Sequence, residues 1–433
     1  MKPIVSIILT SYNKPNSIVK AIESVIKQTY THWELFIMDD NSNEETVKII
    51  SSYLNDPRIH YFNSQIKENE RYKSTRYATL INEAILKTKG KYISYLTDDN
   101  IYLPNRLKVM VNFLAQRKNV DVVYSEQRVI YFDQNGKCVK EHIRKAQGVQ
   151  YRAAGRVDHC SVMHTRKIAD LVYKKYGNYW NDDPQYWLNG DAAFWNRLNE
   201  LQPFHPIPQI LDVAWKFPES FQRLNANVPK NIPNGTLVRG LSNEIYLIDQ
   251  QKRRLISNEM LQKLNYKIER IVKIPDPFLF KYEEGTPIDE NIFLEPEKIP
   301  NQRLIKAKDS PSIYLIQNNK KYHIKNINVF KQYHFKVDDI VILEEDMISK
   351  IPDSNQTIDS VNNTKSILPD GVLFKCNSQF YLAFNNRLHS IEKDVINRLK
   401  LSVNDAIVMH PSLLSNYDKG EPFSWVKKSL FVK

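Results

Sequence analysis

Over its first hundred residues the chain alternates short apolar runs with amphipathic segments, and this alternation constrains the fold more than any other feature. The apolar runs are rich in β-branched and aromatic residues, as strands are. The segments between them repeat apolar residues every three or four positions, as helices do. Strands that alternate with helices build a mostly parallel α/β sheet. The expected strands are residues 4–9, 33–38, 59–62 and 91–96, and the expected helices are residues 17–28, 44–54 and 77–87.

Three of the expected strands run directly into polar loops. The carboxyl ends of parallel strands share one edge of the sheet, where ligands bind, so these loops should converge. Adjacent carboxylates at such an edge need a compensating cation, and Mg²⁺ prefers one or two carboxylates together with phosphate oxygens. The pattern favours a site for a metal and a diphosphate, although each loop by itself also suits an ordinary solvated turn. The loops are residues 10–15, 39–42 and 97–100.

Several side chains in and near these loops suit a nucleotide. Tyr12 can stack on a base, and Asp39 or Asp40 can accept a hydrogen bond from a base imide or a ribose hydroxyl. Arg71 and Arg76 can neutralise a diphosphate, because a guanidinium matches phosphate geometry. A loop aromatic, a helix cap and surface charges explain the same residues without a ligand. The first loop, TSYNKPN, has no glycine, which argues against nucleotidyl transfer and against a dinucleotide-dependent oxidoreductase.

Four segments, IVSIILTSYNK, ELFIMDDNSNEET, TRYATLINEAI and YLTDDNIYLPNRL, resemble family 2 glycosyltransferases of the GT-A fold. The resemblance is greatest to the spore-coat polysaccharide and spore maturation glycosyltransferases of spore-forming bacilli. It continues through VDHCSVMH and GDAAFWNRLN and ends near residue 220. It implies a Rossmann-like GT-A domain, a UDP- or dTDP-linked sugar donor, a divalent metal (Mn²⁺ or Mg²⁺) and inversion at the anomeric carbon.

The same resemblance assigns roles to individual residues. Tyr12 and Asp40, with Asp39 beside it, are expected to meet the base, and Asp98 the ribose. Asp99 is expected to bind the metal. The expected donor-binding residues are thus Thr10, Tyr12, Asn13, Asp39, Asp40, Arg71 and Asp98.

Beyond residue 120 the pattern predicts strands over residues 120–125 and 128–132, and a helix over residues 192–201. Asp191 precedes that helix, where an aspartate is commonly a cap. The resemblance instead makes Asp191 the general base that takes the proton of the acceptor hydroxyl. Asp158 is the second candidate, on the acceptor side. Four aromatic residues suit either a sugar-stacking wall or ordinary packing, namely Tyr179, Trp180, Tyr186 and Trp187.

The second half of the chain contains three copies of one unit. The anchor tyrosines Tyr246, Tyr314 and Tyr381 are 68 and 67 residues apart. Each copy has the pattern strand, strand, turn, strand, helix and short extended segment, which predicts an α+β module of three stacked repeats. The predicted domains are a GT-A domain over residues 1–226, a linker over 227–234 and a module over 235–433, with repeats near 235–288, 302–354 and 370–423.

Composition narrows the choice of partners and compartment. The net charge of +12 favours anionic partners, but no nucleic-acid-binding module accompanies it, so nucleic acid is not expected. The sequence has no apolar stretch of about 18 residues, so we expect no membrane span. The N-terminus is typical of a first strand, not of a signal peptide. Cys138, Cys160 and Cys376 form no disulfide framework, which suits a reducing cytoplasm. The resemblance points to the mother-cell cytoplasm or the spore surface.

Two classes of function remain open from the sequence. The first is an inverting, metal-dependent hexosyltransferase that glycosylates a glycan or protein hydroxyl in the synthesis of spore-surface or other cell-surface polysaccharide. The second is an assembly protein of the spore surface whose transferase domain is weak or inactive. Asp98, Asp99 and Asp191 in one chain favour the first class. The repeats are expected to mediate homo-oligomer or spore-surface protein contacts.

Overall fold

The computed structural model describes residues 4–218, 220, 223–224, 228–363 and 366–425. Contacts within the chain divide it into two compact units, Met1–Arg223 and Leu224–Lys433. The predicted end of the GT-A domain at residue 226 and the predicted start of the linker at residue 227 lie outside the described residues. That boundary therefore stays a prediction.

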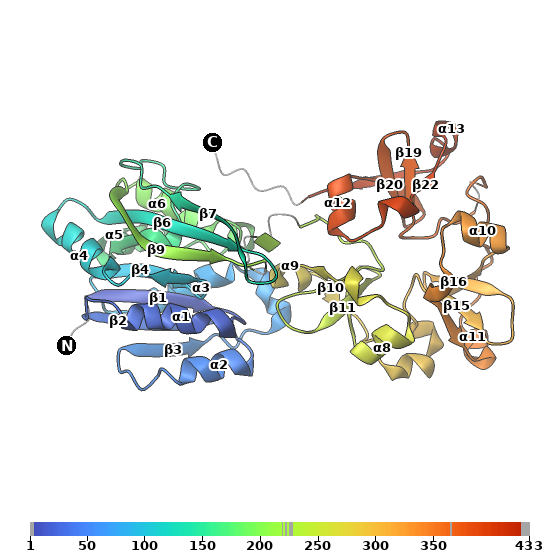
Figure 1. Cartoon of the computed structure of the whole chain (residues 1–433), viewed down its shortest axis with the longest axis horizontal. Coiled ribbons are helices and arrows are strands. Elements are labelled where there is room, and N and C mark those ends of the chain that lie inside the picture. Colours follow the sequence, from blue (N-terminus) through green and yellow to red (C-terminus); the bar gives the residue numbers. More distant parts are fainter. Residues whose placement is uncertain (1–3, 219, 221–222, 225–227, 364–365, 426–433) are drawn as a thin grey trace. The chain divides into compact units, whose positions relative to one another are not determined.

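A mixed sheet forms the centre of the first unit (Figure 1). Among the described residues it has nine strands in the order β3-β2-β1-β4-β8-β6-β9-β5, with β7 paired to β6. Strands β3, β2, β1 and β4 are parallel, and β8 pairs antiparallel with β4. The predicted α/β sheet of the GT-A kind is confirmed. The strands are β1 (Val5–Ser11), β2 (Trp33–Asp39), β3 (Ile59–Asn63), β4 (Tyr92–Thr97), β5 (Asn100–Tyr102), β6 (Val122–Phe132), β7 (Cys138–Arg144), β8 (Val162–Thr165) and β9 (His205–Lys216).

Helices cover both faces of this sheet. β1 is buried along its whole length, as parallel strands between two helical layers are. Ile7 and Leu9 of β1 pack in one core with α1 and α4, whereas Ile8 packs in the other core with α3, α5 and α6. The helices of this unit are α1 (Pro15–Ile26), α2 (Glu44–Ser51), α3 (Arg76–Lys87), α4 (Arg106–Gln116), α5 (Arg166–Tyr176) and α6 (Gly190–Asn199).

One long strand replaces two that the sequence predicts. Residues 120–125 and 128–132 were expected as separate strands, but β6 runs through Val122–Phe132. The polar pair between them, Glu126 and Gln127, interrupts the apolar pattern without ending the strand. The pairing of β6 with β9 shifts register at Ser125, Glu126 and Gln127, so the sheet accommodates the polar residues through a local irregularity.

The second unit contains three small sheets, one for each repeat (Figure 1). In each sheet three strands pair antiparallel in chain order, and a fourth pairs parallel with the first. The first repeat has β10 (Leu237–Arg239), β11 (Ile245–Asp249), β12 (Lys252–Ile256), α8 (Asn258–Lys263), β13 (Val272–Lys273), α9 (Asp276–Leu279) and β14 (Glu283–Glu284). The second has β15 (Leu304–Ala307), β16 (Ile313–Gln317), β17 (Lys320–His323), α10 (Ile327–Gln332), β18 (Ile340–Leu343) and α11 (Glu345–Lys350). The third has β19 (Leu373–Cys376), β20 (Gln379–Phe384), β21 (Arg387–Ile391), α12 (Lys393–Arg398), β22 (Ile407–Val408), α13 (Pro411–Leu414) and β23 (Lys419–Phe423).

The hairpin turn of each repeat has the same backbone geometry. Two successive residues have positive φ in each turn, between 50° and 58°. This is the geometry of a type I′ turn, whose twist matches the twist of the flanking strands. The pairs are Gln250 and Gln251, Asn318 and Asn319, and Asn385 and Asn386.

Apolar cores join neighbouring repeats. One core combines Leu247 and Leu261 of the first repeat with Ile305 of the second. Another combines Phe330 of the second repeat with Phe374 of the third. Each repeat therefore completes its core against a neighbour, as stacked repeats do.

Across the described ranges, no helix is both long and apolar enough to cross a membrane. The three cysteines Cys138, Cys160 and Cys376 are free thiols.

Candidate active site

Two adjacent carboxylates lie where β4 ends. Asp98 is buried, and its Oδ2 accepts a hydrogen bond from the backbone N–H of Tyr12 at 3.0 Å. Asp99 Oδ1 accepts from Thr97 Oγ1 at 2.7 Å, and its Oδ2 accepts from Ser220 Oγ at 3.3 Å. The loops that follow β1 and β4 therefore meet at Asp98.

The charge balance at this point suits a cation. Burial, together with the charge of Asp99, raises the pKa of Asp98 to about 7, and the nearby Lys14 lowers it in part. A divalent cation would offset both carboxylates, and carboxylate oxygens are the ligands that Mg²⁺ and Mn²⁺ accept. The residues present thus fit the metal that the resemblance implies.

Asp40, at the end of β2, is clamped by two arginines. Arg71 Nη2 lies 2.6 Å from Asp40 Oδ2, and Arg76 Nη2 lies 2.7 Å from Asp40 Oδ1. Arg71 also donates from Nη1 to the Asp40 backbone oxygen at 2.6 Å. Its guanidinium lies 3.6 Å from the centre of the Tyr12 ring. The structure therefore brings Asp40, Arg71 and Tyr12 together, as the resemblance implies. Arg71 and Arg76, which were expected to neutralise a diphosphate, pair with the carboxylate of Asp40.

The remaining expected donor-side residues fix the backbone of these loops. Asp39 is fully buried and accepts hydrogen bonds from Tyr61 Oη at 3.0 Å and Asn63 Nδ2 at 3.1 Å. Burial raises its pKa. Asn13 donates from its backbone N–H to Ser42 Oγ at 2.9 Å, which ties the first loop to the second. Thr10 lies within β1 between β2 and β4.

The two candidate bases lie in different electrostatic surroundings. Asp158 Oδ2 lies 2.6 Å from Arg144 Nη1. Although burial opposes ionisation, Arg144 and then His159 hold the pKa of Asp158 well below its usual range. Asp191 is the second residue of α6, and its Oδ1 accepts from the backbone N–H of Ala192 at 2.8 Å. Burial raises the pKa of Asp191, and the charge of His159 opposes that rise. Asp191 is thus the more basic carboxylate.

Tyr77 positions the N-terminus of α6. Its Oη accepts a hydrogen bond from the backbone N–H of Gly190 at 2.7 Å. Burial and the nearby charge of Asp191 keep Tyr77 protonated by raising its pKa far above the usual range. A Cβ at residue 190 would lie 2.7 Å from the Tyr77 oxygen, so a glycine precedes Asp191 for lack of space.

A buried polar network extends from the acidic turn to Asp158, and the sequence did not reveal it. Thr97, which donates to Asp99, lies 3.7 Å from Cys160 Sγ, and Gln127 Nε2 lies 3.3 Å from Asp158 Oδ1. Arg106 is fully buried at the start of α4 and donates to the backbone oxygen of Cys160 at 2.6 Å. Asp212, also fully buried, accepts from Gln127 Nε2 at 2.6 Å. Burial raises the pKa of Asp212 to about 6. Charged residues in helices and strands usually face solvent, so only the inward alternation of β6 and β9 could have hinted at this network.

The aromatic residues divide into packing and partly exposed groups. Trp180 is fully buried and stacks on Phe194, with ring centres 5.0 Å apart. Tyr179 is also buried, so both residues belong to the core. Tyr186 and Trp187 are partly exposed.

Asp158, His159 and Cys160 bring three possible metal-ligand atoms within 4.8 Å of one another. Arg144 already compensates the charge of Asp158. The acidic turn at Asp98 and Asp99 is therefore the better cation site.

Known proteins resemble this chain over part or most of its length. The glycosyl transferase family 2 profile matches residues 6–172. Protein CgeD of Bacillus subtilis is 40% identical over 398 residues, which span 92% of this chain and 90% of that protein. The putative colanic acid biosynthesis glycosyl transferase WcaA of Escherichia coli is 34% identical and spans 27% of this chain and 39% of its own length. The UDP-Glc:alpha-D-GlcNAc-diphosphoundecaprenol beta-1,3-glucosyltransferase WfgD of E. coli is 33% identical and spans 29% of this chain and 47% of its own length. Among solved structures, S. aureus TarS 1-349 in complex with UDP aligns with a TM-score of 0.38 at 18% identity, over 51% of this chain and 62% of that one.

Proposed function

The chain belongs to glycosyl transferase family 2, and we propose that its first unit transfers a sugar, with inversion, from a UDP- or dTDP-linked donor to a hydroxyl group of a glycan or protein. The acidic turn Asp98–Asp99, held against Tyr12 at the shared edge of the sheet, carries this proposal. The names of two relatives support parts of the proposal: that of WfgD gives UDP-Glc as the donor, and that of WcaA is putative colanic acid biosynthesis glycosyl transferase. We propose that the product is part of a cell-surface polysaccharide, including that of the spore, and that the reaction takes place in the cytoplasm.

In this proposal the donor lies along the strand ends. The Tyr12 ring stacks on the base, and Asp40 accepts a hydrogen bond from it. The guanidinium of Arg71 holds both groups in place from the opposite side, because it pairs with Asp40 and lies over Tyr12. Asp98 accepts a hydrogen bond from a ribose hydroxyl. Asp99, with Asp98 beside it, would hold a divalent metal, which when bound neutralises charge on the departing diphosphate.

Asp191 is the general base of the proposal. It takes the proton of the acceptor hydroxyl as that oxygen attacks the anomeric carbon from the side opposite the leaving diphosphate, so configuration inverts. The raised pKa of Asp191 favours proton acceptance, while Asp158 is kept ionised by Arg144 and serves acceptor binding. The Tyr77–Gly190 hydrogen bond orients the helix turn that carries the base.

A donor screen with the full chain tests the activity. Release of nucleoside diphosphate from UDP- and dTDP-sugars is measured with Mn²⁺ or Mg²⁺ and with candidate acceptors. Asp191→Asn should cut transfer by roughly two to four orders of magnitude and leave donor binding nearly unchanged. The matched control is Asp170→Asn, an exposed carboxylate on α5, which should transfer at the wild-type rate.

The outcomes separate the alternatives. Wild-type transfer by Asp191→Asn would move the base to Asp158. Loss of donor binding in that variant would make Asp191 a structural cap. No release with any donor would favour the other class of function, an assembly protein with an inactive transferase domain.

A further inference from the structure

Lys216, the last residue of β9, is a buried cation without a partner. The residue is 6% exposed, and its ammonium makes no ion pair or hydrogen bond with any described residue. Burying an ammonium without a compensating group is costly, so such a group normally has an anion or several hydrogen-bond acceptors beside it. Part of the Lys216 ammonium still reaches solvent, so a dissolved anion can contact it.

The other buried cations of the described chain all have partners. Each donates from its side chain to a carboxylate or a backbone oxygen. The direct comparison is Lys321, which donates to the backbone oxygens of Ile348 and Ile351 at 3.1 and 2.8 Å. Lys216 is therefore an exception that packing within the chain does not explain. The partnered cations are Arg71, Arg106, Arg253, Arg254 and Lys321.

The side chain of Lys216 lies on the face of β9 that also carries Asp212. Successive side chains of a strand point to opposite faces, so residues 212 and 216 share one face. On that face Asp212 accepts from Gln127 Nε2, which lies 3.3 Å from Asp158 Oδ1. Although burial opposes it, the charge of Lys216 adds to that of Arg144 in lowering the pKa of Asp158. The ammonium therefore faces the acceptor side of the candidate site.

The backbone on both sides of Lys216 is tied to Asp99. Trp215 donates from its backbone N–H to the Asp99 backbone oxygen at 2.9 Å. Beyond Lys216 the backbone N–H of Phe217 donates to Ser220 Oγ at 3.0 Å, and Ser220 Oγ donates to Asp99 Oδ2 at 3.3 Å. Lys216 therefore lies between the acidic turn and the acceptor-side carboxylate, where a sugar would pass from donor to acceptor.

The leaving diphosphate of the proposed reaction needs more positive charge than the expected residues supply. Arg71 and Arg76, expected in that role, pair with Asp40. Asp98 and Asp99 together offset the charge of a divalent cation, so little of that charge is left for the diphosphate. The diphosphate is anionic in the donor and gains further negative charge when the bond to the sugar breaks. An additional cation beside the acidic turn would stabilise that charge.

We propose that Lys216 is a further active-site residue whose ammonium binds the diphosphate of the sugar donor. This inference rests on the proposed function of the first unit. As the acceptor oxygen bonds to the anomeric carbon, the bond from that carbon to the β-phosphate oxygen breaks, and its electron pair stays on the phosphate oxygen. Lys216 donates a charge-assisted hydrogen bond to the departing phosphate, and the acceptor proton goes to Asp191. The lysine has no partner within the chain because its partner arrives with the donor.

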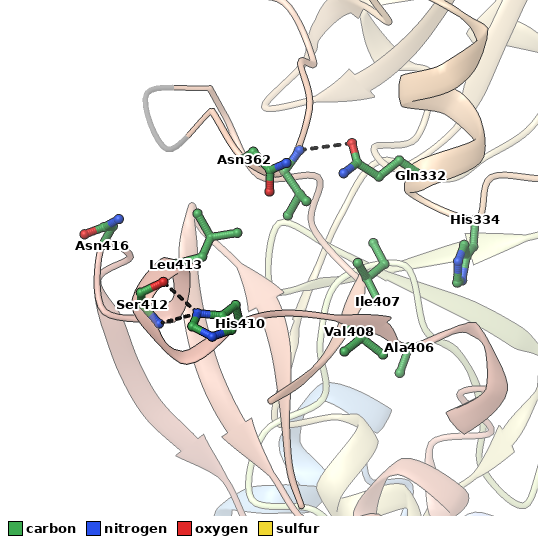
Figure 2. A pocket seen from close by; sticks show the side chains of 11 residues that line it. Gln332, His334, Asn362, Ala406, Ile407, Val408, His410, Ser412, Leu413 and Asn416 are labelled. Atoms are coloured by element: carbon green, nitrogen blue, oxygen red, sulfur yellow. Dashed lines mark hydrogen bonds between the residues drawn. The ribbon is translucent and has the colours of Figure 1, made fainter. Parts of the chain in front are cut away.

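A large hollow of the second unit offers no comparable group. It has a volume of about 850 Å³ and opens between the second and third repeats (Figure 2). None of its described lining residues is Lys, Arg, Asp or Glu. Its polar groups are partly paired with each other, as His410 Nδ1 and Ser412 Oγ are at 2.7 Å (Figure 2). This hollow therefore has no cation for an anionic ligand, whereas β9 has one.

The magnesium complex of inorganic pyrophosphate is the probe, because it carries the charges of the donor without the base or the sugar. Calorimetry measures its affinity for the full chain and for Lys216→Met, in which a side chain of similar length replaces the cation. We expect Lys216→Met to bind the probe at least about tenfold more weakly, the usual contribution of a charge-assisted hydrogen bond. Lys216→Arg, which keeps the charge, should bind it more tightly than Lys216→Met. Uridine and thymidine, which carry no phosphate, should bind equally to the wild type and Lys216→Met.

Melting temperatures separate a binding role from a structural one. Removing a buried charge that has no partner should leave the melting temperature of the ligand-free chain unchanged or raise it. The matched control is Lys20→Met. Lys20 is an exposed residue of α1, and its ammonium lies 4.4 Å from the centre of the Trp215 ring, on the other face of β9. This control should bind pyrophosphate as the wild type does.

Three results would overturn the assignment. Pyrophosphate that binds equally to the wild type and Lys216→Met, or to neither, would remove the contact. A lower melting temperature of Lys216→Met, with the same loss of affinity for uridine as for pyrophosphate, would make the lysine structural. Unchanged pyrophosphate affinity with a raised KM for the acceptor would move the lysine to the acceptor. The pyrophosphate measurement needs no transfer, so a chain that transfers no sugar but binds pyrophosphate through Lys216 would refute the transferase activity and keep the lysine site.

Discussion

Asp40→Asn should destabilise the first unit strongly, because it leaves the buried Arg71 and the mostly buried Arg76 without their anion. The carboxylate binds Arg71 at 2.6 Å and Arg76 at 2.7 Å, and the side chains of Asp40 and Arg71 are each 4% exposed. Breaking a buried ion pair from one side costs about 3–5 kcal/mol. For a domain of this size, 1 kcal/mol shifts the melting temperature by about 2–4 °C. The expected loss is therefore roughly 6–20 °C.

Calorimetric melting of the wild type and the variant measures this loss. Asp56→Asn is the matched control, since Asp56 and Arg58 are also 2.6 Å apart but lie at the surface, with side chains 23% and 36% exposed. An exposed pair contributes about 0–1 kcal/mol, so the control should lose less than about 4 °C. Equal losses in the two variants would refute the argument, because burial would then not decide the contribution of the clamp. A stable Asp40→Asn that no longer binds the donor would show that Asp40 acts on the base alone.

Three further predictions follow from particular contacts. Asp98 has a folded-state pKa of about 7, above its unfolded value of about 3.9, so without metal its ionisation lowers the stability of the first unit as the pH rises from about 4 to 7. Asp98→Asn should flatten that part of the pH–stability curve. Mn²⁺ should raise the melting temperature more at pH 8 than at pH 5, and this effect should be absent in Asp99→Ala. A chain cut after residue 223, where the compact units divide, should remain soluble and bind nucleotide; insolubility of this fragment, checked by gel filtration, would mean that the units share a core. Gly235→Ala should lower the stability of the second unit, because a Cβ at this position would lie 1.8 Å from Gln302 Oε1 and because φ is +82°. The double variant with Gln302→Ala should recover the steric part of the loss but not the backbone strain. Equal melting temperatures of the single and double variants would contradict the contact between residue 235 and Gln302.

Much of the fold follows from local pattern. The apolar runs of the first hundred residues gave the four parallel strands, because burial on both faces demands continuous apolar residues. The convergence of the loops after β1, β2 and β4 also followed, since parallel strands end at one edge. Asp98 and Tyr12 do meet there. A turn between the second and third strands of each repeat was also predicted, and the structure has two residues of positive φ in each of these turns.

Pairings between distant residues are what only the tertiary structure decided. The sequence allowed Arg71 and Arg76 to face a diphosphate, but the fold turns both onto Asp40, which lies more than thirty positions earlier in the chain. The resemblance ranked Asp191 above Asp158 as the base, but only the fold showed that the β6–β7 hairpin brings Arg144 into contact with Asp158. Gln127 looked like a break between strands and is instead buried against Asp212. In the second unit the repeats were visible, but the hydrogen bonds and ion pairs between repeats were not, because local sequence sets the backbone pattern whereas charge partners depend on which surfaces the fold brings together.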